Sequence, residues 1–266
     1  MNRLRQPVGV AILLLGVLTP FVPLVLWSFA GRWRYPGLVP QQGTLRGVRL
    51  LADPTSQVLQ GLATSATIGA AVTVLSVAVG VPAGRALGLY EFRGRSLVRL
   101  LLVAPALVPG LAVLLGTQVF FLRYGLADTR AGVVLVQLVP AIPYVTLVMT
   151  GAYGNFDVDY ERQAALLGAR PWQVQLHVTL PALRPALTVA AYFAFLISWS
   201  EYALTLLIGG GTVKTLPLLL FAYAGGPDPT EAAAVALTVI VPPLLLMALV
   251  VRGLSGRGGT LGLVRS

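Results

Sequence analysis

The sequence predicts an all-α integral membrane protein with six transmembrane helices. Hydrophobic residues make up 56% of the 266 residues and charged residues 11%, whereas soluble proteins carry about 25% charge. The mean hydropathy is +0.82. The charges gather between long uncharged stretches, several of which reach the roughly 20 apolar residues that a helix needs to cross the hydrocarbon core. A membrane barrel would instead show alternating segments of about 10 residues.

Six apolar stretches are the expected spans. They cover residues 8–30, 58–84, 100–122, 131–152, 185–208 and 232–251. We treat residues 1–252 as one transmembrane domain and residues 253–266, which end the chain, as a flexible cytoplasmic tail. The first stretch exceeds the roughly 7–15 apolar residues of a signal peptide, so we expect a retained helix. Spans three and four are expected to bend at their prolines: Pro105, Pro109, Pro140 and Pro143.

The basic residues predict the orientation of the chain in the membrane. Six spans place both termini on one side, and 12 of the 19 Lys and Arg residues fall on that side. Because cytoplasmic loops carry an excess of Lys and Arg, we expect an inner (plasma) membrane protein with both termini cytoplasmic. The net charge of +10 does not indicate nucleic-acid binding, since no basic run exceeds a few residues. The lack of cysteine excludes disulfides, and a single histidine excludes a histidine-based metal site within the chain.

The cytoplasmic connection between spans four and five carries the clearest functional pattern. Residues 157–181 predict two short helices around a break. Acidic residues suit the first turn of the first helix, and Gly168 suits its C-cap. Pro171 fits the first turn of a second, amphipathic helix that carries Trp172. Exposed apolar side chains on a short surface helix indicate a docking partner or contact with the membrane surface.

This segment resembles the EAA loop of permease subunits in bacterial ATP-binding-cassette (ABC) importers. The family pattern is approximately E-A-A-x-x-x-G, nine residues, and then I-x-L-P. The matching positions are Ala164, Gly168, Val178 in place of isoleucine, Leu180 and Pro181. Arg162 and Gln163 depart from the pattern at its glutamate and first alanine, and Glu161, one residue earlier, is the candidate for the missing carboxylate.

The start of the chain resembles one branch of these permeases, which transports polyamines, thiamine or ferric iron. The resemblance rests on Trp27-Ser28-Phe29 and Leu38-Val39-Pro40, and on the Ser-rich, acidic residues 198–202. It implies two permease subunits, with a heterodimer favoured over a homodimer, that form a pathway across the lipid bilayer. It also implies an extracytoplasmic substrate-binding protein and a dimer of ABC ATPase subunits that bind ATP and Mg.

The resemblance further implies that the helix after Gly168 docks onto the ATPase. The residues expected in this coupling are Glu161, Ala164, Gly168, Ala169, Trp172, Gln173, Leu180 and Pro181. The chain itself is then not an enzyme and holds no cofactor. The glycine-rich run 209–215 does not contradict this, because a phosphate-binding loop needs glycine directly before its lysine and Val213 stands before Lys214.

Glu201 is the principal candidate for the substrate pathway. It is the only acid within an expected span, and an ionisable group in a membrane is a functional candidate unless it is paired or hydrated. Glu201 either attracts a cation in the pathway or serves the fold near the outer interface. The other pathway candidates are Ser198, Trp199, Tyr202, Gln118 and Gln137. The aromatic residues among them suit either an organic cation or interfacial anchoring, and the glutamines suit either a cavity or a bond between helices.

The sequence therefore predicts the permease subunit of an ABC importer that moves a small hydrophilic solute, with a polyamine-like or other small cation favoured. The alternative is a self-contained secondary transporter. Such a transporter normally shows more intramembrane charges and two related halves, which this sequence lacks. A membrane hydrolase is disfavoured because no Ser/His/Asp set or pair of intramembrane carboxylates is present.

Overall fold

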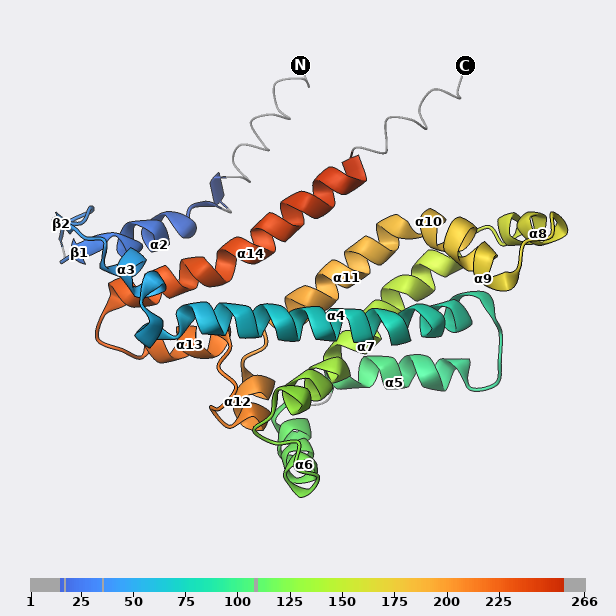
Figure 1. The fold of residues 1–266 in the computed structure, drawn as a ribbon, viewed down its shortest axis with the longest axis horizontal. Coiled ribbons are helices and arrows are strands. Elements are labelled where there is room, and N and C mark those ends of the chain that lie inside the picture. The colour runs from blue at the N-terminus through green and yellow to red at the C-terminus, as the bar shows by residue number, and fades with distance from the viewer. Residues whose placement is uncertain (1–14, 17, 35, 108–109, 256–266) are drawn as a thin grey trace, which may run out of the picture. The chain divides into compact units, whose positions relative to one another are not determined.

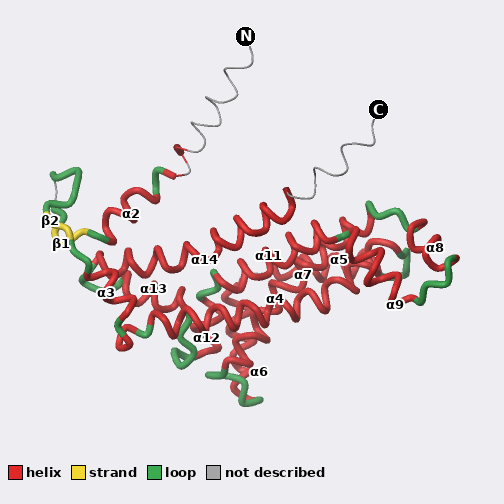
Figure 2. The backbone as a smooth tube through the Cα atoms, turned by 45° about the horizontal axis from the view of Figure 1, so that its top comes forward, coloured by secondary structure: helices red, strands yellow, loops and turns green. Residues whose placement is uncertain are grey.

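The computed structural model describes residues 15, 16, 18–34, 36–107 and 110–255, and these residues are mostly helical (Figures 1 and 2). The α-helices are α2 (Phe21–Ser28), α3 (Arg46–Ala52), α4 (Val58–Leu89), α5 (Arg95–Leu107), α6 (Gly110–Arg123), α7 (Arg130–Gly154), α8 (Asp159–Leu166), α9 (Pro171–Val174), α10 (Leu180–Ala182), α11 (Arg184–Trp199), α12 (Ala203–Gly209), α13 (Leu216–Ala224) and α14 (Pro229–Ser255). A 3₁₀ turn covers Pro54–Ser56, and a π-helix covers Gln175–Thr179. Strands β1 (Ala30–Arg32) and β2 (Gln42–Gly43) pair antiparallel.

Among the described residues, three helices are long and apolar enough to cross a membrane: α4, α7 and α14. They coincide with the expected spans 58–84, 131–152 and 232–251. A fourth candidate is the pair Pro171–Ala182 and Arg184–Trp199, which is bent by 78°. The helical membrane character is thus confirmed with three to four candidate spans, and the count of six stays a prediction.

The remaining expected spans fall on shorter helices. Span 8–30 begins outside the described residues, and α2 covers only its last part. Span 100–122 falls on α5 and α6, on either side of residues 108–109, which lie outside the described residues. Span 185–208 falls on α11 and α12, which are interrupted at residues 200–202. By contrast, α7 runs on through Pro140 and Pro143. Helix α14 runs on to Ser255, three residues into the expected tail, and residues 256–266 lie outside the described part.

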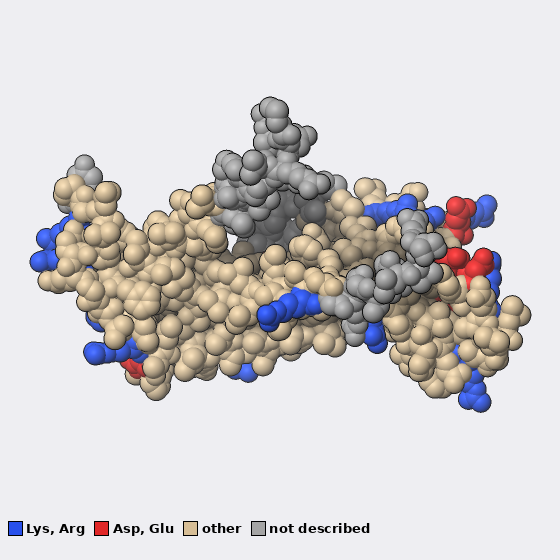
Figure 3. Space-filling view, turned by 90° about the horizontal axis from the view of Figure 1, so that it is seen from above, with Lys and Arg blue, Asp and Glu red and all other residues tan. Residues whose placement is uncertain are grey.

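The described chain forms two compact units. The first contains residues up to Ala63 together with Lys214–Pro242, and the second contains Thr64–Val213 together with the residues from Pro243 onward. Helices α4 and α14 contribute to both units. Figure 3 shows one face of the molecule, on which uncharged surface predominates and acidic side chains gather at the end of the second unit that carries α8.

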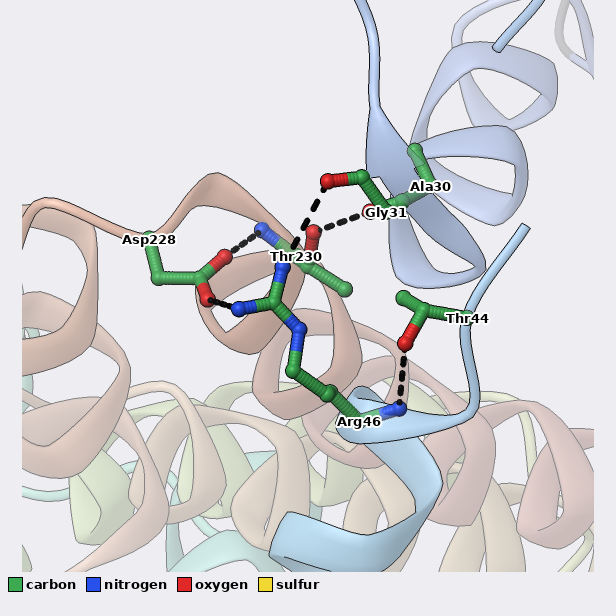
Figure 4. Close-up of polar contacts among 6 residues, drawn as sticks. All are labelled: Ala30, Gly31, Thr44, Arg46, Asp228 and Thr230. Carbon is green, nitrogen blue, oxygen red and sulfur yellow. Dashed lines mark hydrogen bonds and ion pairs between the residues drawn. The ribbon is translucent and has the colours of Figure 1, made fainter. Parts of the chain in front are cut away.

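The first unit brings the connection between the first two expected spans together with the residues just before the last one. Arg46, which begins α3, forms an ion pair of 3.1 Å with Asp228 at the start of α14 and donates to the Gly31 carbonyl at 3.5 Å (Figure 4). The Thr230 hydroxyl donates to the Ala30 carbonyl at 2.5 Å. Strand β1, helix α3 and the start of α14 are therefore held as one assembly. Part of residues 209–231, which connect the fifth and sixth expected spans, forms the apolar helix α13.

The core of the second unit is built around α7. Helix α4 approaches α7 through glycines spaced four residues apart, so that backbone lies against side chain. A Cβ added to Gly80 would lie 2.6 Å from Val145 Cγ1, one added to Gly84 would lie 2.5 Å from Met149 Cβ, and one added to Gly88 would lie 2.7 Å from Tyr153 Cβ. Because glycine has no side chain, this stripe permits a helix contact that no other residue type could make.

Each end of the second unit gathers segments that the sequence assigns to one side of the membrane. At one end, the turn between α4 and α5 lies beside the segment that carries α8, α9 and α10 (Figure 1). At the other end, the Asp128 N–H donates to the Ile208 carbonyl at 2.7 Å, and the Thr212 hydroxyl donates to the Asp128 carbonyl at 2.9 Å. This grouping supports the expected alternation of loops, and the identity of the cytoplasmic end stays a prediction.

Candidate functional site: the segment between α7 and α11

We call residues 155–183 the docking segment. Its first helix, α8, begins after Asp157, whose side chain accepts the Asp159 N–H at 2.9 Å. Helix α8 ends at Leu166, and Gly168, two residues later, has φ +89°. The Gly168 N–H donates to the Ala165 carbonyl at 3.0 Å, and the Ala169 N–H donates to the Ala164 carbonyl at 3.1 Å. These two bonds define a Schellman C-cap, which turns the chain sharply and confirms the glycine cap that the sequence predicts.

The tip of the docking segment exposes apolar side chains. Leu166 is 88% exposed and Leu167 is 89% exposed, while Trp172 and Leu176 are each more than half exposed. Helix α9 begins at Pro171, and the Gln173 side chain accepts the Arg170 N–H at 2.8 Å ahead of it. A rigid turn thus presents four large apolar groups on a short stretch, which is typical of a surface that a partner covers.

At the base of the docking segment, Glu161 joins three parts of the chain. Its two carboxylate oxygens accept from the Arg85 guanidinium at 2.7 Å and 2.6 Å, in a bidentate pair with α4. The same carboxylate accepts the Thr179 hydroxyl at 2.5 Å, from the π-helix. The Glu161 side chain is 11% exposed and that of Arg85 is 23% exposed. Arg85 also lies over the ring of Tyr153 at the end of α7, 5.8 Å from its centroid.

The Arg85 hydrogen bonds hold the pKa of Glu161 below its ordinary value, against burial, which acts in the opposite direction. Glu161 is therefore an anion in the folded protein. A pocket of about 270 Å³ opens beside this pair between α8 and α9. It is lined by Arg85, Val158, Glu161, Arg162, Ala165, Ala169, Pro171, Val174 and Gln175.

The lowered pKa gives a testable pH dependence. Since the folded-state pKa lies below that of the unfolded chain, the stability from ionised Glu161 is fully present above the ordinary glutamate pKa of about 4.3. That contribution is lost as the pH falls through the folded-state value. We expect the thermal unfolding midpoint in detergent to fall more steeply from about pH 7 to about pH 3.5 in the wild type than in Glu161→Gln, because glutamine does not titrate. Equal slopes for the two proteins would contradict the assignment.

The structure shows where the sequence-predicted coupling residues lie. Glu161, Ala164, Gly168 and Ala169 belong to α8 and its cap, and Trp172 and Gln173 belong to α9. Leu180 and Pro181 belong to α10, which follows the π-helix in the chain. Sequence reasoning missed Arg85 and Thr179 as partners of Glu161. The one sequence feature that pointed to a partner role for Arg85 was its charge directly after the expected span 58–84.

Two of the pathway candidates, Gln137 and Ser198, belong to a buried polar cluster. The Ser198 hydroxyl donates to Gln137 Oε1 at 2.5 Å, and Gln137 Nε2 donates to the Thr205 hydroxyl at 2.9 Å. Gln137 and Ser198 are buried, as is Trp199, which stacks on Phe195 with ring centroids 5.3 Å apart. These bonds join α7 to α11 and α12, which is the interhelical use of glutamine that the sequence left open.

Glu201 lies at the break between α11 and α12. Its Oε1 accepts the Leu204 N–H at 2.8 Å, which satisfies a free donor in the first turn of α12. Glu201 and Tyr202 are partly exposed, and Gln118 is partly exposed on α6, away from this cluster in the sequence. The structure thus gives Glu201 a role in helix capping, whatever its part in transport.

The sequence comparisons define the class of protein. Residues 80–257 match the family described as the binding-protein-dependent transport system inner membrane component. The chain therefore belongs to this family of ABC transport permeases and is a multi-pass protein of the inner membrane. The matched region contains the docking segment, the glycine stripe of α4 and the polar cluster around Gln137.

Individual relatives agree with this assignment. The chain is 36% identical over 225 residues to the molybdenum transport system permease protein ModB of Mycobacterium tuberculosis, covering 78% of this chain and 82% of the relative. It is 28% identical over 249 residues to the putative 2-aminoethylphosphonate transport system permease protein PhnV of Salmonella typhimurium, covering 91% and 92%. A crystal structure of a bacterial ABC transporter involved in the import of the acidic polysaccharide alginate has the same fold, with a TM-score of 0.72, 19% identity and coverage of 94% and 95%. Nothing in these comparisons supports the secondary transporter.

Proposed function

We propose that this chain is one of two six-span permease subunits in an ABC importer and that its docking segment couples it to a separate ATPase subunit. The observation that carries the proposal is the exposed apolar tip of Leu166, Leu167 and Trp172 on a turn fixed by Gly168. ATP and Mg are held by the ATPase, and an external binding protein supplies the solute. We further propose that the second permease is a different chain and that both termini of this chain lie in the cytoplasm.

Purification from the native membrane in gentle detergent tests this function. Mass spectrometry of the retained proteins is expected to find an ATPase subunit, which is lost when Leu166, Leu167 and Trp172 are all replaced by serine. A matched control replaces Leu38, which is 90% exposed in the first unit, with serine. Recovery of a chain that binds no ATPase and still transports in vesicles would refute the proposal in favour of a secondary transporter.

The substrate class is a separate part of the proposal. The sequence favours a small cation because of Glu201, but a carboxylate that caps α12 serves the fold without any cation. The similarity to a molybdenum permease favours a small oxyanion. We therefore propose a small hydrophilic anion of the molybdate class as the first candidate and a polyamine-like cation as the second.

Glu201→Gln distinguishes the two candidates. Glutamine keeps an oxygen that can accept the Leu204 N–H, so helix capping survives while the charge is lost. We expect cells that depend on this importer to take up molybdate at an unchanged rate with Glu201→Gln. A loss of putrescine uptake, with unchanged amounts of assembled transporter, would instead establish the cation and a pathway role for Glu201. Glu201→Ala removes the charge and the cap together, so its difference from Glu201→Gln reports on the cap.

A further inference from the structure

We propose that the Glu161 carboxylate, clamped by Arg85 and Thr179, is the link that makes the docking segment move together with α4 and α7 when the ATPase moves. This inference rests on the proposed function, because it assigns the route by which a docked ATPase acts on the membrane helices. Arg85 and Thr179 are in this view positioning residues. They act through Glu161 and do not contact the solute.

The geometry of the contact supports a link that resists rotation. A single hydrogen bond lets two helices pivot, whereas a bidentate guanidinium–carboxylate pair fixes both distance and plane. The two bonds measure 2.7 Å and 2.6 Å, and the Thr179 hydroxyl of the π-helix adds a third at 2.5 Å. Both charged side chains are largely shielded from water, so the pair is weakened little by solvent screening.

The Arg85–Glu161 pair lies between the exposed tip and the membrane helices, so it can pass a movement of the tip to α4 and α7. Glu161 lies about one and a half turns before Leu166 and Leu167, which belong to the exposed tip. On its other side, Arg85 belongs to the last turns of α4 and also contacts the Tyr153 ring of α7. Helices α4 and α7 are packed together along the glycine stripe, so a displacement passed to Arg85 reaches both.

The alternative is an ion pair that only stabilises the fold, and the two roles predict different results. If the pair only stabilises the fold, breaking it lowers ATPase docking, ATP hydrolysis and solute uptake together, in proportion to the loss of folded protein. If the pair is a link, breaking it leaves ATPase docking and ATP hydrolysis intact and lowers the amount of solute transported per ATP. The ratio of uptake to hydrolysis in the assembled importer therefore separates them.

The experiment uses the complete importer, purified with its ATPase, second permease and binding protein and reconstituted in proteoliposomes. We expect Glu161→Gln and Arg85→Lys to retain the ATPase and its hydrolysis, and to lower solute uptake per ATP at least about fivefold, the lower end of typical coupling. The reversed pair Arg85→Glu with Glu161→Arg should recover most of the ratio. Asp159→Asn is the matched control, since it breaks the exposed Arg162–Asp159 pair of 2.7 Å on the same helix and should change nothing.

A distance measurement gives a second readout that does not depend on transport rate. The chain has no cysteine, so labels on this subunit attach only to introduced cysteines, which we place at two exposed positions, Glu91→Cys and Gln163→Cys. We expect their separation to stay constant between the nucleotide-free and the ATP–vanadate-trapped importer, and to shift or broaden on trapping once Glu161→Gln is added. An unchanged uptake ratio in both Glu161→Gln and Arg85→Lys would overturn the link. Failure of the wild-type chain to retain any ATPase would instead overturn the proposed function.

Discussion

Replacing Gly84 with leucine is expected to prevent the second unit from folding. A Cβ at Gly84 already meets Met149 Cβ at 2.5 Å and the Thr150 backbone nitrogen at 3.0 Å, so the α4–α7 contact cannot adjust through a flexible side-chain end. Overpacking a dense interior typically costs about 1–3 kcal/mol and occasionally more, and a leucine placed against backbone belongs at the upper end. We expect a loss of monodisperse protein in size-exclusion chromatography of the detergent-solubilised chain.

Gly151→Leu is the matched control for this prediction. Gly151 also lies inside a membrane helix, α7, but no atom beyond the neighbouring backbone of α7 lies within 4 Å of a Cβ added there. Its replacement should leave yield and elution unchanged. Gly84→Ala should lie between the two, with a lowered thermal midpoint. A normal elution profile for Gly84→Leu would show that α4 and α7 are not in the close contact described.

Replacing Gly168 with valine is expected to separate the chain from its ATPase without unfolding it. A β-branched residue strongly resists φ +89°, and left-handed backbone costs about 1–2 kcal/mol for residues other than glycine. The α8 cap must then open, which moves Leu166 and Leu167 relative to Trp172. We expect recovery of the ATPase in purification to fall about tenfold, which corresponds to about 1.4 kcal/mol.

The chain offers a close control at Gly94. Its φ is +91°, and like Gly168 it has no atom within 4 Å of an added Cβ. Gly94→Val therefore imposes the same backbone strain at the turn between α4 and α5, outside the docking segment. If both variants lose the ATPase equally, strain rather than the shape of the docking segment is responsible. Gly168→Asn should be mild, because asparagine tolerates the left-handed region.

The sequence predicts the parts of this fold that depend on local chemistry. Long apolar runs located α4, α7 and α14, and Gly168 and Pro171 located the end of α8 and the start of α9. Residues 185–208 were expected to form one span although Glu201 interrupts their apolar run, and the helix break at residues 200–202 was missed. Only the backbone path shows that α11 ends before Glu201 and that the Glu201 carboxylate accepts an N–H from the first turn of α12. The apolar helix α13 was missed because glycines and prolines flank it.

The candidate site also has one part that the sequence predicts and one part that it does not. The tip of the docking segment could be predicted because its turn is encoded by neighbours in the sequence. The base could not, because Arg85 lies 76 residues from Glu161 and meets it only when α4 and α8 are placed in space. Likewise the bonds of Gln137 to Ser198 and Thr205 span 61 and 68 residues. A single sequence shows that such groups need partners without showing which ones.

The glycine stripe of α4 also restricts which parts of this subunit can act as hinges. Helices held with backbone against side chain over Gly80, Gly84 and Gly88 cannot slide past each other without losing that fit. The α4–α7 pair in the second unit therefore behaves as a rigid lever. Changes of backbone torsion are left to places where a helix is already interrupted, such as residues 200–202 and the 78° bend before α11. We expect a permease built this way to open and close by reorienting whole helices about these breaks.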